Sequence, residues 1–382
     1  MPESEKIKIA FTLPFNLRFG EGLSRVCLSY IKNISKDKFD PYIIQTDFFK
    51  NQRMTEEAIS DSLGGIHVIT LHRPDAFILR FLPRGILGLA YSLLIEPVIF
   101  KIMGRQLIKN FSESIRGTEL AYLFNNNLRF LFKDIKVIGS THSWNPQDMN
   151  PLVRKYNKLR MAIWRIPIYH SFPKNGNFFS ENTSTKYFTL PNGVDTDFFT
   201  PAESETHQTV NFLYVSRLED CKGMDILPSA WHEFGADQKM QLTIVGAGSR
   251  ENEAREMERK FGNVLFKGVV DEQSLLEMYQ NADILLFPST CDTFGLVVLE
   301  GLSSGLYCLV DMSLMGVFDN FYEKGFLTYV FHNSKDLSKA LIKATSQIIE
   351  IRKNKNTTHM ETAATSSWKT VTEKFEENIL SF

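Results

Sequence analysis

The chain has 382 residues, of which 43% are hydrophobic and 23% charged, and its formal net charge is −1. This length allows two domains, each with a sizeable core, and the composition excludes a disordered or fibrous chain. No stretch reaches the roughly 18–20 uncharged apolar residues that a membrane span requires.

The two halves differ in charge. Residues 1–190 contain 26 basic and 16 acidic residues, whereas residues 191–382 contain 17 basic and 28 acidic residues. A basic half joined to an acidic half indicates two domains with different partners. We expect no nucleic-acid partner.

The sequence predicts no metal site. Asp195 and Asp197 form an Asp-x-Asp pair, but it follows a turn, and no strand delivers it to a cleft. The cysteines show neither metal-ligand nor paired spacing, which indicates reduced thiols of a cytosolic protein. They are Cys27, Cys221, Cys291 and Cys308.

The first half begins with a predicted buried strand over residues 6–13, a loop that contains Gly20 and Gly22, and a helix over residues 23–34. A strand, a glycine loop and a helix in this order often let a phosphate approach the backbone. The glycine pattern is not the dinucleotide fingerprint, and a plain strand-to-helix turn explains it equally well.

Residues 76–111 are mostly apolar with interleaved basic residues, and residues 154–165 repeat this character around Trp164. Such segments can lie in a membrane interface, where each basic residue near anionic headgroups contributes about 1 kcal/mol. The alternative is that both are core-packing helices with solvated basic edges.

A strand over residues 136–142 carries His142 at its carboxyl end, which is the edge of a parallel sheet where ligands bind. A structural role for this histidine is the alternative. The turn residues 191–195 mark a hinge between two domains, 1–190 and 191–363.

The second half alternates strands and helices, which predicts a doubly wound parallel sheet. Arg217 and Lys222 follow its first strand, and residues 289–300 follow a strand that ends at Pro288. Ser289, Thr290 and Asp292 are good N-cap types, so we expect a helix to begin there. On such a helix Asp292 and Glu300 would lie about two turns apart and face one cleft.

Two cations and a helix N-terminus at one sheet edge form a site for a highly charged anion. The carboxylates of Asp292 and Glu300 are poor phosphate neighbours but good acceptors for sugar hydroxyls. The sequence therefore favours a nucleotide diphosphate sugar over a bare nucleotide.

Five motifs in this order resemble glycosyltransferase family 4, a group of retaining enzymes with the GT-B fold. They are Pro191-Asn192-Gly193-Val194-Asp195, Arg217-Leu218 with Lys222-Gly223, Val245-Gly246 with Gly248, Phe266 with Gly268, and the element from Asp292 to Glu300. The tail around Ser367-Trp368 resembles the family's closing helix. The likeness is strong over residues 186–310, patchier over 1–185, and returns at the end.

The resemblance implies two Rossmann-like domains that face each other across a cleft, with residues 364–382 returning to the first. It implies that Arg217 and Lys222 bind the diphosphate, that Glu300 binds the ribose, and that Val269 and Val270 lie near the base. Asp292 and the backbone of Thr293, Phe294, Gly295 and Leu296 would hold the donor sugar.

In the first domain, Gly20 and Gly22 would approach the phosphates and His142 would contact the sugar. No metal or other cofactor is implied, because Arg, Lys and the helix dipole stabilise the leaving diphosphate. The expected product keeps the anomeric configuration of a hexose taken from a UDP- or GDP-sugar. We expect a cytoplasmic protein at the inner membrane face, with a lipid-linked acceptor.

Two departures from the family pattern put the donor in question. Asp292 stands where the family usually has Glu, and the segment 306–316 lacks the usual proline and paired glycines. The alternatives are a catalytically silent sugar-nucleotide-binding or scaffold subunit and, third, a nucleotide-sugar epimerase.

Overall fold

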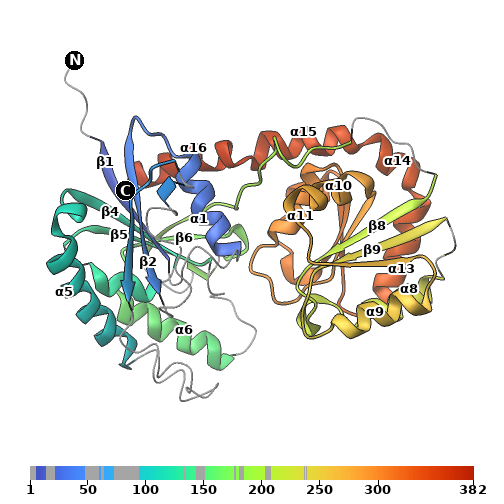
Figure 1. The fold of residues 1–382 in the computed structure, drawn as a ribbon, viewed down its shortest axis with the longest axis horizontal. Coiled ribbons are helices and arrows are strands. Elements are labelled where there is room, and N and C mark those ends of the chain that lie inside the picture. Colours follow the sequence, from blue (N-terminus) through green and yellow to red (C-terminus); the bar gives the residue numbers. More distant parts are fainter. Residues whose placement is uncertain are drawn as a thin grey trace. The chain divides into compact units, whose positions relative to one another are not determined.

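The chain folds into two units, each with its own parallel sheet (Figure 1). The first unit contains residues 1–190 and 372–382, and the second contains residues 191–371, so it runs beyond residue 363. The computed structural model describes residues 6–13, 22–47, 60–61, 64–72, 94–124, 126–132, 134–142, 151–175, 178–179, 185–202, 208–235, 237 and 239–382.

A seven-stranded parallel sheet forms the first unit, in the order β3-β2-β1-β4-β5-β6-β7. Its strands are β1 (Ile7–Leu13), β2 (Phe39–Asp47), β3 (Val68–His72), β4 (Thr118–Leu123), β5 (Lys136–Ser140), β6 (Ile168–Ser171) and β7 (Lys186–Thr189). The central strands β1 and β4 begin with partly exposed or exposed residues and are buried over the rest of their length.

Three long helices lie in the described part of this unit before its end: α1 (Gly22–Asn33), α5 (Glu96–Ile115) and α6 (Pro151–Trp164). The buried face of α5 packs closely on the 3₁₀ helix η3 (Asn126–Leu131), because Gly104 leaves room for the backbone of Leu131. None of the described helices combines the length and the hydropathy that a bilayer crossing requires.

The second unit contains a six-stranded parallel sheet in the order β10-β9-β8-β11-β12-β13. Its strands are β8 (Val210–Val215), β9 (Met240–Val245), β10 (Val264–Gly268), β11 (Ile284–Phe287), β12 (Tyr307–Asp311) and β13 (Leu327–Val330). Counted within the unit, the order is 3-2-1-4-5-6, the Rossmann order. The predicted pair of doubly wound domains is confirmed.

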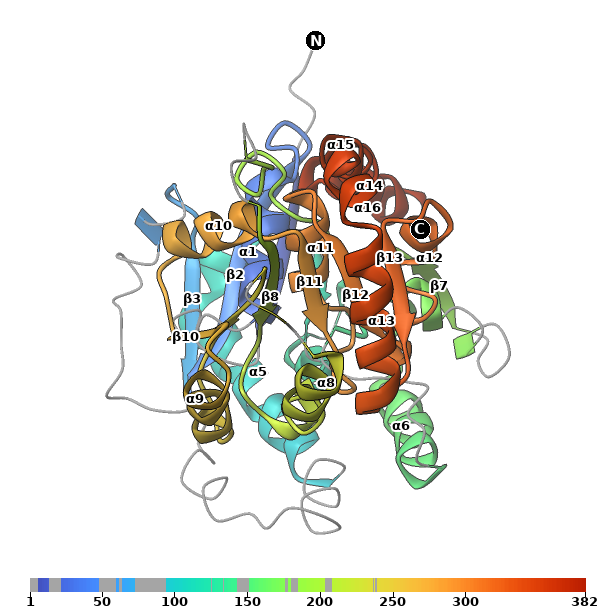
Figure 2. The same cartoon turned by 90° about the vertical axis from the view of Figure 1, so that its right-hand side faces the viewer.

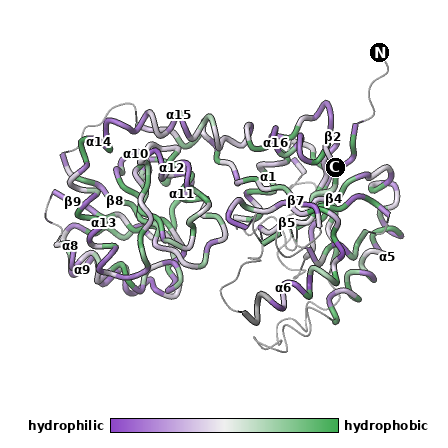
Figure 3. Tube along the Cα trace, turned by 180° about the vertical axis from the view of Figure 1, so that it is seen from behind, coloured by the Kyte–Doolittle hydropathy of each residue, from purple (hydrophilic) through white to green (hydrophobic). Residues whose placement is uncertain are grey.

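Helices cover both faces of the second sheet (Figures 1 and 2). One face carries α8 (Leu227–Phe234), α9 (Glu251–Lys260) and α13 (Ser334–Ser346), and the other carries α10 (Glu272–Asn281) and α11 (Leu296–Ser303). The core on the α8 side includes Trp231, Ile244 and Leu341, all fully buried or nearly so. The charged outer face of α9 appears as hydrophilic trace in Figure 3.

A short helix, α12 (Asp319–Glu323), connects β12 to β13, and the chain leaves the second unit through α14 (Ile348–Lys353), α15 (Lys355–Ser366) and α16 (Trp368–Ser381). Asp283, fully buried just before β11, anchors this tail. Its carboxylate accepts hydrogen bonds from Arg352 at 2.9 and 3.0 Å and lies 3.3 Å from Nζ of Lys355. In the first unit, Glu376 of α16 accepts from the amide of Ser35 and pairs with Lys38.

Candidate functional site

The candidate site lies where the strand order of the second sheet reverses. Strands β8 and β11 are hydrogen-bonded neighbours, with Ile284 opposite Phe212 and Leu286 opposite Tyr214. The chain departs from these two strands in opposite directions along the sheet. Loops at such a switch point leave room for a ligand at the carboxyl edge.

The loop after β8 is held close to the start of the loop after β11. It forms a short 3₁₀ helix, η5 (Asp220–Lys222), that ends at Gly223 with φ of 92°. A Cβ at Gly223 would lie 2.4 Å from the ring of Pro288, so only glycine fits this approach. Tyr214 donates to the carbonyl of Lys222 at 3.0 Å, and burial raises the pKa of this tyrosine, which keeps the hydroxyl a donor.

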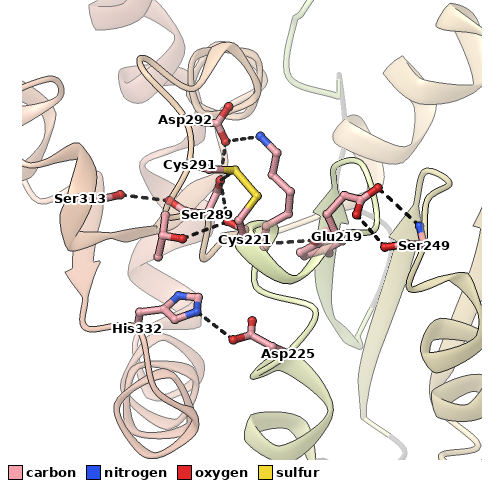
Figure 4. The surroundings of a disulfide bond; sticks show 12 residues. Glu219, Cys221, Asp225, Ser249, Ser289, Cys291, Asp292, Ser313 and His332 are labelled. Atoms are coloured by element: carbon pink, nitrogen blue, oxygen red, sulfur yellow. Dashed lines mark hydrogen bonds and ion pairs between the residues drawn. A yellow bond between two sulfur atoms is a disulfide. The ribbon is translucent and has the colours of Figure 1, made fainter. Parts of the chain in front are cut away.

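The ion pair between Lys222 and Asp292 is the central contact of the site (Figure 4). Nζ of Lys222 lies 2.8 Å from Oδ2 of Asp292, and their side chains are 9% and 24% exposed. The hydroxyl of Ser289 donates to the same oxygen at 2.5 Å. The structure therefore brings together one of the two predicted cations and the predicted sugar-binding carboxylate.

Arg217 lies in the same loop, two residues after β8, and is exposed. The backbones of the loops after β8 and β9 are in direct contact. Gly246 is close enough to Ser216 that an added Cβ would lie 1.8 Å from the Ser216 carbonyl oxygen, so no side chain fits there. The amide of Leu218 donates to the carbonyl of Ala247 at 3.0 Å. The predicted Gly-x-Gly turn thus fixes the course of the loop that carries Arg217 and Lys222.

The helix after β11 begins later than we predicted. It starts at Leu296, its N-cap is Gly295 with φ of 87°, and no side chain caps it. The expectation that Ser289, Thr290 or Asp292 caps this helix is wrong, because these side chains bond to the loop after β8 instead: the two hydroxyls donate to the carbonyl of Cys221, and Asp292 pairs with Lys222. The prediction that Asp292 and Glu300 lie two turns apart on one helix is also wrong, because Asp292 precedes the helix start at Leu296.

The predicted backbone donors lie at this helix start. Thr293 is partly exposed, Phe294 is buried against Phe318, and Leu296 opens the helix. The atypical segment 306–316 packs against this helix start. A Cβ added at Gly295 would lie 3.0 Å from the side chain of Leu314 in η6 (Met312–Leu314).

Glu300 is 3% exposed, in the middle of α11. Its Oε2 accepts a hydrogen bond of 2.9 Å from the hydroxyl of Tyr279, which is itself fully buried. Val269 and Val270 follow β10, at the same edge of the sheet, and Val269 is 78% exposed.

Three of the predicted residues, Gly20, Gly22 and His142, belong to the first unit. His142 follows β5, is 9% exposed, and packs against the rings of Phe124, His170 and Phe172. Gly22 is the exposed first residue of α1. Gly20 lies outside the described residues.

Cys221 and Cys291 form a disulfide, which the sequence analysis missed. The prediction of four reduced thiols is therefore wrong for this pair, whereas Cys27 and Cys308 are free and buried. The signal was the position of each cysteine: Cys221 directly precedes Lys222, and Cys291 directly precedes Asp292. Because β8 and β11 are neighbours, residues 70 apart in sequence meet at the site.

Among the described residues, no group of three or more His, Cys, Asp or Glu side chains is arranged to hold a metal ion. Lys222 and Arg217 supply positive charge to the candidate site instead. Their chemistry suits a phosphate-bearing ligand.

Comparison with known proteins finds a matching family model for part of the chain. Residues 196–359 match the family model described as glycosyl transferases group 1. The chain is 31% identical over 134 residues to D-inositol 3-phosphate glycosyltransferase of Corynebacterium aurimucosum, and 30% identical over 125 residues to phosphatidyl-myo-inositol mannosyltransferase of Mycobacterium tuberculosis. Each match covers 30% of this chain and 32% of the relative, so the chain spans about a third of the length of these curated relatives.

The fold likeness extends over nearly the whole chain. The structure of Anabaena Alr3699/HepE in complex with UDP-glucose covers 98% of this chain and 100% of its own, with a TM-score of 0.69 at 13% identity. Such identity shows the fold alone. The chain therefore has the GT-B fold and carries a glycosyl transferases group 1 domain over residues 196–359.

Proposed function

We propose that this chain is a retaining, metal-independent glycosyltransferase that moves a hexose from a UDP- or GDP-sugar to an acceptor. The observation that carries the proposal is the Lys222–Asp292 pair at the β8/β11 switch point, inside the matched domain. A cation beside a carboxylate suits a ligand that presents phosphate to one and sugar hydroxyls to the other.

In the proposed reaction the bond between the anomeric carbon and the diphosphate oxygen breaks as the acceptor hydroxyl attacks from the same face. Lys222 and Arg217 stabilise the negative charge that develops on the leaving diphosphate. The acceptor's proton passes to the departing phosphate oxygen. Asp292 and the backbone of residues 293–296 orient the sugar.

Base and ribose recognition complete the proposed donor site. Glu300 accepts from the ribose hydroxyls, and Val269 with Val270 lies beside the base. The solved complex of Alr3699/HepE with UDP-glucose supports a uridine donor. The roles of Gly20, Gly22 and His142 stay predictions.

We propose further that the acceptor is lipid-linked and met at a membrane surface, the inner face of a cytoplasmic membrane. One face of α5 is core, with Ile99, Phe100, Met103 and Leu107 buried. The other exposes apolar side chains, among them Val98 at 55%, Ile102 at 44% and Ile108 at 56%. Lys101, Arg105 and Lys109 are exposed between them. The core-packing alternative therefore holds for one face of α5, and the exposed apolar and basic side chains of the other face support the membrane proposal, over the described part from residue 94.

The second basic segment supports the proposal less. Arg160 stacks on the ring of Trp164 at 4.4 Å, and Trp164 is buried, so this pair belongs to the core. Lys155 and Lys158 remain exposed on α6. The relative named phosphatidyl-myo-inositol mannosyltransferase supports a lipid acceptor.

The proposal is tested by donor turnover. The purified chain is first screened with UDP- and GDP-sugars for thermal stabilisation, since a ligand at 100 times its Kd adds about 2.7 kcal/mol. Release of nucleoside diphosphate from the stabilising donor is then measured for Lys222→Ala and Arg217→Ala. Loss of one charge-stabilising group is expected to lower kcat about 10²- to 10³-fold. Lys335→Ala, exposed on α13, is the control.

The outcomes separate the alternatives. Turnover within threefold of the parent for both variants contradicts the diphosphate assignment. Donor binding without hydrolysis or transfer indicates the silent subunit. A changed sugar on the nucleotide, formed without acceptor, indicates the epimerase.

A further inference from the structure

The disulfide Cys221–Cys291 crosses the candidate site from one loop to the other (Figure 4). The two Cα atoms are 5.6 Å apart, within the usual range for a disulfide. Cys221 lies in η5 after β8, and Cys291 lies in the loop between β11 and α11. The bond therefore ties together the two loops that leave the switch point.

The same two loops carry the ion pair, one residue further along each. Lys222 follows Cys221, Asp292 follows Cys291, and their side chains meet at 2.8 Å. The amide of Thr290 donates to the carbonyl of Cys221 at 2.9 Å. Breaking the disulfide therefore removes a restraint on the backbone that positions both charged groups.

The two sulfurs of the pair belong to exposed residues, unlike the other thiols. Cys221 and Cys291 are exposed, whereas Cys27 and Cys308 are fully buried. Burial raises the pKa of both free thiols, which keeps them protonated and unreactive. Thiol–disulfide exchange needs access for an attacking thiolate, so a soluble dithiol can select the Cys221–Cys291 pair.

We propose that Cys221 and Cys291 form a reversible thiol–disulfide modification site that sets the affinity of the donor site for a nucleoside diphosphate. This rests on the proposed function. In the oxidised form the covalent tie holds Lys222 and Asp292 in place for the ligand. Reduction leaves only the hydrogen bonds and the ion pair between the loops, so their positions spread and affinity falls.

The exchange balances with a dithiol as reductant. A thiolate of the dithiol attacks one cysteine sulfur, the Cys221–Cys291 bond breaks, and a mixed disulfide forms. The second thiol of the reductant closes a ring and releases the second cysteine. The protein gains two electrons and two protons and holds two thiols, and the dithiol is oxidised to a cyclic disulfide.

The first measurement counts thiols in the full chain. Alkylation in denaturant without reductant is expected to label two cysteines, Cys27 and Cys308, and alkylation after dithiothreitol is expected to label all four. Four labels without reductant in protein treated with an oxidant such as diamide would overturn the proposal.

The second measurement is the Kd for UDP and for GDP by calorimetry, before and after dithiothreitol. The Kd of whichever nucleotide binds is expected to rise about threefold to tenfold on reduction and to return after reoxidation with diamide. The Cys221→Ser/Cys291→Ser variant is expected to keep the reduced Kd in both conditions. Cys308→Ala, a buried thiol outside the site, is expected to respond like the parent, and Cys27→Ala replaces it if it does not fold.

The two proposals fail differently. An equal Kd in both redox states overturns the redox site and leaves the glycosyltransferase assignment standing. An unchanged redox response in the double serine variant also overturns only the redox site. No binding of either nucleotide in both states overturns both proposals.

Discussion

Nζ of Lys222 lies 2.8 Å from Oδ2 of Asp292, although the two residues are 70 apart in sequence. Asp292→Asn keeps the shape of this side chain and removes its charge, so the sugar loses a strong acceptor and Lys222 loses its counter-ion. We expect kcat for donor turnover to fall about 10²- to 10³-fold. Steady-state kinetics at a temperature where the variant is folded measures this.

Asp197→Asn is the matched control for that experiment. Asp197 is exposed and belongs to the Asp-x-Asp pair that we rejected as a metal site. Turnover of this variant is expected to equal that of the parent, with and without a chelator. A loss as large as that of Asp292→Asn would show that the wrong carboxylate has been assigned.

The buried carboxylate of Asp283 predicts a stability effect away from the site. Asp283→Asn leaves Arg352 and Lys355 without their counter-ion, and such a break costs about 3–5 kcal/mol. Urea denaturation, followed by tryptophan fluorescence, measures the loss. An unchanged midpoint would contradict the anchoring role of this pair.

The same residue predicts how stability depends on acid. Burial acts to raise the pKa of Asp283, but the hydrogen bonds from Arg352 and the Asn211 amide, with the charge of Lys355, outweigh it and lower the pKa below 3.8. Stability from a lowered acid pKa is complete above the unfolded value and decreases as pH falls below about 4. Asp283→Asn should weaken this decrease between pH 4 and pH 2.

The sequence predicted the second parallel sheet because short apolar runs alternate with helical patterns there, whereas the first doubly wound domain was expected from the family resemblance. It placed Lys222 and Asp292 at one edge of the second sheet because both follow strands. It did not predict the partners of Asp292. Cap propensity treats Ser289 and Asp292 as helix caps, whereas in the fold Ser289 donates to Asp292, and Asp292 pairs with Lys222. Only the adjacency of β8 and β11 reveals that bond and the Cys221–Cys291 disulfide.

Burial was the second property hidden from the sequence. The sequence predicted that Glu300 faces a cleft, but its burial and its hydrogen bond from the hydroxyl of Tyr279 on the neighbouring α10 could not be read from the sequence. For the segment of Arg160 and Trp164 the sequence left a membrane interface and core packing open, and the fold stacks the two side chains together with Trp164 buried. Both cases depend on which face of a helix meets its neighbour, and periodicity alone leaves that open.

His170 predicts a second pH effect, in the first unit. Its Nε2 lies 3.1 Å from the carbonyl of Leu190, which can only accept, so Nε2 carries the proton and Nδ1 accepts from Tyr122 at 2.5 Å. Burial, and then the nearby His142, lower the pKa of His170 well below 6.5. The folded state therefore keeps this ring neutral while the unfolded state takes up a proton.

Because the unfolded state binds one more proton than the folded state at low pH, acid lowers the stability of the fold. Stability is complete above about pH 6.5 and falls at lower pH, with a slope of about 1.4 kcal/mol per pH unit for one proton. Urea denaturation of the parent and of His170→Gln at pH 7.5 and pH 5 measures it. A slope that is the same in both proteins would assign the effect to another group.

The exposed face of α5 predicts binding that depends on lipid charge. Arg105→Glu/Lys109→Glu reverses two charges on this face, and each basic residue near an anionic surface is worth about 1 kcal/mol, so vesicle affinity should fall at least about tenfold. Co-sedimentation with vesicles of phosphatidylserine and phosphatidylcholine, against phosphatidylcholine alone, measures it. Lys335→Glu is the charge control, and vesicle binding of this variant should fall much less because Lys335 lies in the other unit, on α13.

Ile102→Gln tests the apolar contribution of the same face of α5 to vesicle binding, with Ile349→Gln, 83% exposed on α14, as its control. Equal binding of the parent to both kinds of vesicle, or to neither, would make this face an ordinary solvated surface, and the acceptor would then have to reach the donor site from solution.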